Sequence, residues 1–87
     1  MDIYIYFKTE TEIDIDGLEE NIEELLEDKG EVTGRGMGIS GMNIDVELYD
    51  KDILEYFLQE IRKLDFPDNT YYVINNKKIK LFYNEAD

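Results

Sequence analysis

Cysteine and histidine are absent from this chain of 87 residues, and proline occurs once. The lack of cysteine excludes disulfides, thiol catalysis and cysteine-based metal sites, and it fits a reducing compartment. The lack of histidine removes the usual activator of a serine or threonine nucleophile. No apolar run approaches the ~20 residues of a membrane span, and the N-terminal residues do not resemble a signal peptide. We therefore expect a soluble cytoplasmic protein that is not an enzyme and uses no cofactor or metal.

Positive charge is also scarce, because nine Lys and Arg face 22 Asp and Glu, which gives a formal net charge of −13. Such a surface repels nucleic acid and anionic membranes and attracts basic proteins. Residues 1–33 alone hold twelve acids and two bases. This asymmetry indicates a directed electric field, so we expect the partner to be a basic protein.

The length predicts one domain covering residues 1–87, and the 43% apolar content is enough for one modest core. Residues 2–9 alternate, with Ile3, Ile5 and Phe7 on the buried face, as in a strand. A helix is predicted from about residue 17 to residue 29, with Asp16 as its N-cap and Gly30 as its stop.

The rest of the chain predicts two strands over residues 31–39 and 43–49, a helix over 51–64, and a hairpin of strands 70–75 and 78–83. Asn75 and Asn76 supply the turn of that hairpin. The resulting α+β order predicts a ferredoxin-like βαββαβ sandwich, with two helices on one face of an antiparallel sheet and a C-terminal β-hairpin.

Residues 36–41 (GMGISG) match the G-x-G-x-x-G pattern of dinucleotide sites. That pattern needs a helix directly after it, whereas a strand is predicted here. We interpret Gly34, Gly36 and Gly38 as strand glycines that permit a bulge or the close approach of another backbone. The sequence leaves open whether this strand is a sheet edge that another chain can join.

Residues 12–23 resemble an EF-hand calcium loop, since acids occupy positions 1, 3 and 5, Gly17 position 6 and Glu23 position 12. The first position is Glu rather than Asp, and the predicted element before it is a strand rather than a helix. A capped connection from strand to helix explains the same residues, and calcium binding remains an alternative.

Two groups of residues are candidates for partner binding. The first is the acidic face of the first helix, where like charges four residues apart cost a few tenths of a kcal/mol each. The second is the sheet face opposite the helices, which we expect to show Tyr4, Tyr6, Lys8, Thr33, Arg35, Met37, Ile39, Asp45, Glu47 and Tyr49. From these groups we predict the binding residues Asp14, Asp16, Glu19, Glu20, Glu23, Glu24, Glu27, Tyr4, Tyr6, Asp45 and Glu47.

The segment Gly34–Leu48 (GRGMGISGMNIDVEL), followed by a helix that ends in Leu64–Thr70 (LDFPDNT), resembles a pattern of small bacterial immunity proteins. These proteins are encoded with polymorphic or contact-dependent toxins. The resemblance implies an inhibitor that blocks the active site of a cognate toxin, many of which are basic nucleases. Opposite charges would accelerate their association. A nucleic-acid mimic that blocks a host nuclease or restriction complex is an alternative function, and a homodimer through the open sheet face is also possible.

Overall fold

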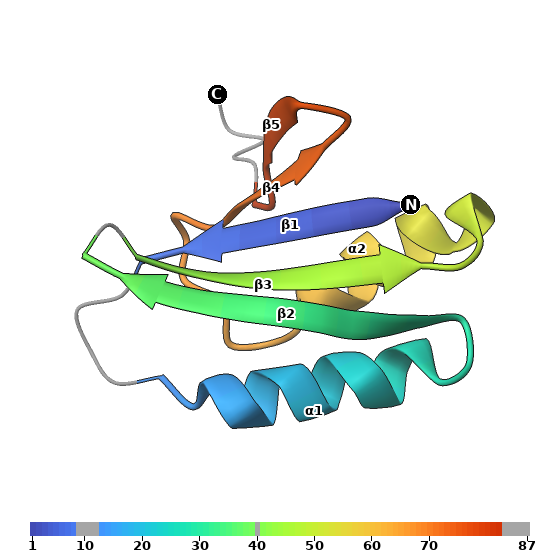
Figure 1. Ribbon diagram of the computed structural model, residues 1–87, viewed down its shortest axis with the longest axis horizontal. Helices are drawn as coiled ribbons and strands as arrows, with labels where there is room; N and C mark the ends of the chain where they lie inside the picture. The colour runs from blue at the N-terminus through green and yellow to red at the C-terminus, as the bar shows by residue number, and fades with distance from the viewer. Residues whose placement is uncertain (9–12, 40, 83–87) are drawn as a thin grey trace.

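The computed structural model describes residues 1–8, 13–39 and 41–82 and shows an α+β protein with an antiparallel sheet and two helices (Figure 1). The elements are β1 (Asp2–Phe7), α1 (Ile15–Leu26), β2 (Gly30–Gly38), β3 (Gly41–Leu48), the 3-10 turn η1 (Lys51–Ile53), α2 (Leu54–Ile61), β4 (Tyr71–Ile74) and β5 (Lys77–Lys80). The α+β class is confirmed. Neither helix is long and apolar enough to cross a membrane within the described ranges.

The sheet has five strands in the order β2-β3-β1-β4-β5, so β2 and β5 are its edges. The predicted C-terminal hairpin is present as β4 and β5, with β5 as the strand beyond β4, and the strand order does not confirm the ferredoxin-like prediction. This strand forms because Asn75 and Asn76 adopt positive φ angles of 52° and 65°. Two successive residues of this kind make the tight turn whose twist matches that of a hairpin.

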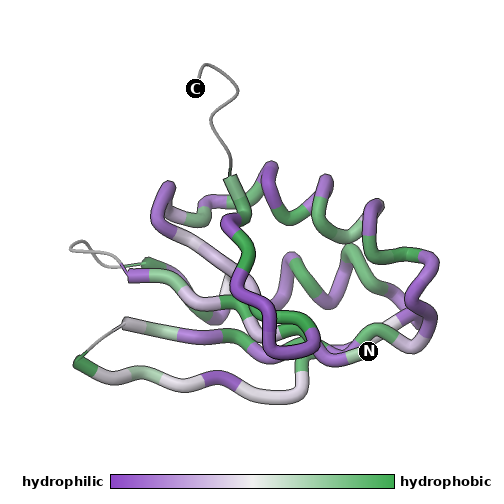
Figure 2. Tube along the Cα trace, turned by 90° about the horizontal axis from the view of Figure 1, so that it is seen from above, coloured by the Kyte–Doolittle hydropathy of each residue, from purple (hydrophilic) through white to green (hydrophobic). Residues whose placement is uncertain are grey.

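One face of the sheet and both helices contribute to a single apolar core. The strands supply Ile3 and Ile5 from β1 and Ile44 from β3, all 0% exposed. Each helix contributes apolar side chains from successive turns of one face. These are Leu18, Ile22 and Leu26 from α1 and Phe57, Leu58 and Ile61 from α2. Figure 2 shows these apolar positions recurring among polar ones along the chain, which is the pattern of half-buried elements.

The boundaries of α1 differ from the prediction at both ends. The N-cap is Asp14 rather than Asp16, because the Asp14 carboxylate accepts a hydrogen bond of 2.9 Å from the Gly17 N–H. The helix ends at Leu26, and Glu27 follows with a left-handed φ of 55°. Gly30 is therefore not the helix stop. A Cβ there would lie 2.5 Å from the Glu47 carbonyl oxygen, so Gly30 permits close packing against β3.

The later elements are shorter than predicted. The second helix divides into η1, capped by the Asp50 carboxylate on the Asp52 N–H, and α2, which ends at Ile61. The predicted strands 70–75 and 78–83 are β4 and β5, with residue 83 outside the described ranges.

A β-bulge between Val32 and Gly34 corrects the predicted faces of β2. Beyond the bulge, Arg35 pairs with Ile44 and Met37 with Met42, and directly paired residues point to the same face. Arg35 and Met37 therefore lie on the core side of the sheet, and not beside Tyr4 as the alternation predicted. The extra residue in a bulge reverses the alternation of all residues that follow it.

Replacing Glu27 with Gly should raise the free energy of unfolding by about 1 kcal/mol, because glycine adopts a left-handed φ without the Cβ clash. The matched control is Glu20→Gly, which removes the same charge from the middle of α1 and should lower stability by about 1 kcal/mol. Urea denaturation of both variants measures the difference. Changes of the same sign would contradict this account of the helix end.

Candidate protein-binding surface

The exposed side of α1 carries an excess of carboxylates. Asp16, Glu19, Glu20 and Glu23 line a shallow hollow of about 340 Å³. These four residues, together with Glu24 and Glu27, are here called the acidic stripe. Within the described ranges the carboxylates of Glu20 and Glu23 form no ion pair, and the same holds for Glu24 and Glu27. All four side chains are exposed to solvent. These four carboxylates therefore present negative charge that no ion pair offsets in the described part of the chain.

Arg35 is the one base that reaches the acidic stripe among the described residues. Its guanidinium donates hydrogen bonds to the carboxylates of Asp16 and Glu19, the second at 2.9 Å. The bond to Asp16, with the negative charge of Glu19, raises the pKa of Arg35 above its ordinary value. These contacts exist because the bulge turns Arg35 toward the helices. They fix β2 beside α1, but one cation against two carboxylates leaves the site negative.

The outer face of the sheet, opposite the core, has a different character. Tyr6 of β1 and Tyr71 of β4 stack with ring centroids 5.1 Å apart and planes 17° apart. The Lys78 ammonium lies 4.1 Å from the centre of the Tyr71 ring, as in a cation–π contact. Tyr4 is 39% exposed on the same face. Aromatic side chains fixed in this way are the residue types that anchor protein interfaces.

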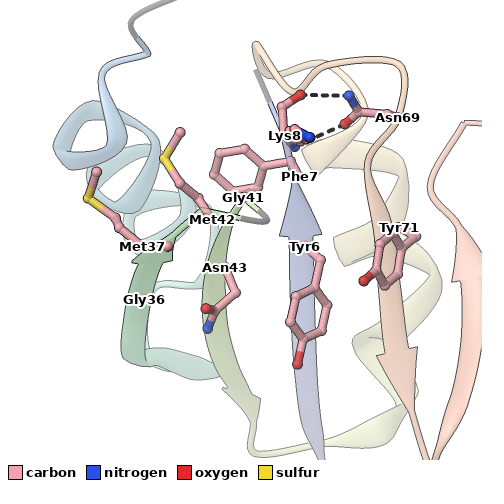
Figure 3. Close-up of a pocket in the computed structure, with 11 residues that line it drawn as sticks. Tyr6, Phe7, Lys8, Gly36, Met37, Gly41, Met42, Asn43, Asn69 and Tyr71 are labelled. Carbon is pink, nitrogen blue, oxygen red and sulfur yellow. Dashed lines mark hydrogen bonds between the residues drawn. The ribbon is translucent and has the colours of Figure 1, made fainter. Parts of the chain in front are cut away.

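A hollow of about 570 Å³ lies at one end of this outer face (Figure 3). Its floor is open because Gly36 and Gly38 present no side chains. A Cβ on Gly36 would meet the Asn43 side-chain oxygen at 2.6 Å. At its rim the Asn69 side chain bonds the Lys8 backbone twice, accepting from the N–H at 3.1 Å and donating to the carbonyl at 2.6 Å. These two bonds connect the end of β1 to the segment before β4 at the rim of the hollow.

A row of like charges crosses three strands on the outer face. Glu47 of β3 lies directly opposite Asp2 of β1 on one side and Glu31 of β2 on the other. Like charges that face each other directly across strands are destabilising. The Tyr49 hydroxyl relieves part of this repulsion by donating a hydrogen bond to the Glu31 carboxylate. Asp45, in the next outward position of β3, accepts a 2.9 Å bond from the Asn43 amide.

The predicted binding residues divide between two surfaces that meet at β2. The residues of α1 and its cap are Asp14, Asp16, Glu19, Glu20, Glu23, Glu24 and Glu27, and those of the outer face are Tyr4, Tyr6, Asp45 and Glu47. Sequence reasoning missed Glu31, Asn43 and Tyr71, as well as the role of Arg35. The strand glycines indicated that a bulge was allowed, but only its position between Val32 and Gly34 places Arg35 next to α1.

The alternative of a calcium loop over residues 12–23 lies partly outside the described ranges. Asp14 caps α1 and Asp16 pairs with Arg35, while Glu12 lies outside the described ranges. No group of three or more side chains suited to a metal ion occurs in residues 1–8, 13–39 and 41–82.

Comparison with known proteins gives no match to a protein-family model, a curated protein or a solved structure.

The bond between Tyr49 and Glu31 should be visible in a pH titration. The hydrogen bond, together with desolvation and the charges of Glu31 and Glu47, raises the pKa of Tyr49. Its contribution to stability is complete below the unfolded pKa of about 10 and is lost as the pH rises through the raised folded value. Glu31→Gln should lower the pKa of Tyr49, measured by NMR of labelled tyrosine rings. Glu24→Gln, an equal charge change on α1, should leave it unchanged, and equal shifts in both variants would refute the contact.

Sodium chloride should raise the melting temperature, because screening weakens repulsion among exposed carboxylates. A gain of about 1 kcal/mol corresponds to roughly 4–8 °C for a domain of this size. The replacement of Glu20, Glu23 and Glu24 by Lys changes the formal net charge from −13 to −7 and should shrink the salt effect. Calorimetry at low and high salt measures both, and a flat response of the wild type would contradict the prediction.

Proposed function

We propose that the chain is an acidic protein-binding module that neutralises a basic partner through the acidic stripe of α1. The observation that carries this proposal is the exposed negative charge of Glu20, Glu23, Glu24 and Glu27, which no ion pair offsets within the described ranges. A basic protein surface supplies the missing counter-charge, whereas nucleic acid and anionic lipid would be repelled.

The position of these acids on α1 supports the proposal. Glu19 and Glu23, like Glu20 and Glu24, lie four residues apart on the helix, a spacing that is unfavourable for like charges. Glu23 and Glu27, like Glu24 and Asp28, have the same spacing in the sequence, but the second residue of each pair lies past the end of α1 at Leu26. Acids near a helix C-terminus also oppose the helix dipole. A chain that keeps charges at such unfavourable positions uses them for something other than stability.

The resemblance to immunity proteins suggests what the partner is. In this proposal the basic partner is a toxin, and the acidic stripe occupies a cleft that binds phosphate groups, as expected for a nuclease. Opposite charges would speed the encounter. The exposed ring of Tyr4 and the half-buried ring of Tyr6 would add slow-dissociating contacts if the partner extends across β2 to the outer face.

The same proposal includes the finer description of the fold. We describe it as a ferredoxin-like βαββαβ sandwich extended by β5, with both helices against the face of Ile3, Ile5 and Phe7. The mixing of residues from α1, α2 and this face in one core supports it. The arrangement leaves the outer face and the acidic stripe accessible at the same time.

Reversal of the stripe charge should abolish partner capture. Tagged wild-type protein should retain a basic partner from the lysate of its own cells at low salt, and high salt should release that partner. The variant with Glu20, Glu23 and Glu24 changed to Lys should lose it, with association slowed at least about tenfold.

The matched control changes the exposed acids Glu55, Asp65 and Asp68 to Lys, which alters the net charge equally but leaves α1 intact. This control should keep most of the capture. If both triple variants lose the partner alike, the binding depends on overall charge rather than on α1. If neither loses it, the acidic stripe is not the binding surface.

A further inference from the structure

The edge strand β2 has backbone groups that the sheet does not use. The hydrogen bonds at the end of β3 show which of its residues bond to which neighbour. Met1, just before β1, and Leu48 of β3 exchange backbone hydrogen bonds of 2.8 Å. The next residue, Tyr49, donates instead to Lys29, just before β2, at 2.9 Å. Residues of a strand bond alternately to its two neighbours. Even-numbered residues of β3 therefore bond to β1, and odd-numbered residues bond to β2.

The register then identifies the free groups. Val32, Arg35 and Met37 lie opposite Val46, Ile44 and Met42, which are even-numbered residues that bond to β1. The N–H and C=O groups of these three β2 residues consequently point away from the sheet. No hydrogen bond outside the ladder is formed by their backbones in the described part of the chain. They are the unpaired donors and acceptors that another extended chain can join.

The two edges of the sheet differ in their protection. At the other edge, β5 has the sequence KKIK, and lysines on an edge strand discourage pairing with another chain. The part of β2 beyond the bulge is GRGMG, in which the only base, Arg35, is held by Asp16 and Glu19. Met37 and Ile39 next to this edge are 74% and 103% exposed. The β2 edge thus combines free backbone groups with exposed apolar side chains.

We infer that the β2 edge binds an extended segment of the basic partner by strand addition, with lysine or arginine side chains of the segment directed at the acidic stripe. This inference rests on the proposed function and specifies its binding mode. Charge decides the occupant, since a second copy would bring another chain of net charge −13 and a second acidic helix to the same edge. A basic segment instead gains attraction from Glu20 and Glu23 while it pairs.

The two sides of the edge define the segment. Side chains of an added strand would alternate between the core side, where the acidic stripe lies, and the outer face. On the outer face, Gly34 and Gly36 leave room beside the hollow of about 570 Å³. The segment should therefore alternate basic residues with bulky apolar ones. Figure 1 shows α1 running alongside β2, and the bonds from Arg35 to Glu19 confirm that the stripe borders this edge.

The test uses two blocked peptides of nine residues, the length of β2. One alternates lysine with valine, and the other alternates lysine with proline, which keeps the charge but removes alternate N–H groups and disfavours strand pairing. At about 20 mM salt, where screening is weak, the lysine–valine peptide should bind at least about tenfold more tightly. It should also slow hydrogen exchange at the Arg35 and Met37 amides, a readout that requires no mutation.

A variant tests the same edge from the protein side. Met37→Pro removes one outward N–H, a position at which proline does not break the sheet's own ladder. This variant should bind the lysine–valine peptide about tenfold more weakly than the wild type does. Met37→Ala, which removes the side chain but keeps the N–H, should have a smaller effect. The melting temperature of each variant shows whether the fold is kept.

The outcomes separate this inference from the proposed function. If both peptides bind equally, shift the α1 resonances and leave β2 exchange unchanged, strand addition is overturned while the acidic stripe stands. If β2 is protected but changing Glu20, Glu23 and Glu24 to Lys has no effect, the proposed role of the stripe is overturned. Absence of binding by both peptides overturns strand addition. Protection of the Arg35 amide that is lost in Met37→Pro supports it.

Discussion

The bulge between Val32 and Gly34 is the constraint on which the functional surface depends. One extra residue turns Arg35 to the side of α1, where it bonds Asp16 and Glu19, and turns Gly34 and Gly36 to the outer face. Without it, a cation would lie among the tyrosines and the glycines would face the helix. The bulge thus holds α1 beside β2 and opens the outer face at the same place.

Repulsion among the carboxylates opposes folding, and burial of the apolar core must outweigh it. Carboxylates repel one another along α1 and across β1, β3 and β2, at Asp2, Glu47 and Glu31. Against this repulsion stands an apolar core from both helices and one sheet face, with Phe57 and Ile22 fully buried. The charge destabilises the folded state, and a positively charged partner would reverse the sign of that contribution. In the proposed function, stability and binding are therefore linked through the same carboxylates.

The sheet has a closed edge and an open one. Lysines on β5 discourage pairing with another chain, and Tyr6, Tyr71 and Lys78 pack against one another on that side of the sheet. At β2 the backbones of Arg35 and Met37 point outward beside a negative helix. An open edge is normally an aggregation hazard, and here the net charge of −13 discourages a second copy from using it. In the proposed function, the same charge that limits self-association favours a basic occupant.

Sequence periodicity determined most of the elements. The alternation of Ile3, Ile5 and Phe7 and the stripe of Leu18, Ile22 and Leu26 predicted β1, α1 and their buried faces, because burial of one face imposes a period of two or 3.6 residues. The turn at Asn75 and Asn76 was also readable, since few residues adopt a positive φ. Composition determined the net charge and hence the kind of partner that electrostatics favours.

The tertiary structure decided which residues share a surface. The end of α1 at Glu27, the bulge in β2 and the five-stranded order depend on contacts between segments far apart in the chain, such as Gly30 against Glu47 and Lys8 against Asn69. Local periodicity carries no information about an inserted residue that reverses the alternation. The sequence by itself determined that the protein is acidic and α+β. Only the packed sheet decided that Arg35 faces α1 and that β2 is an edge, because register is set by the partner strand and not by the strand's own residues.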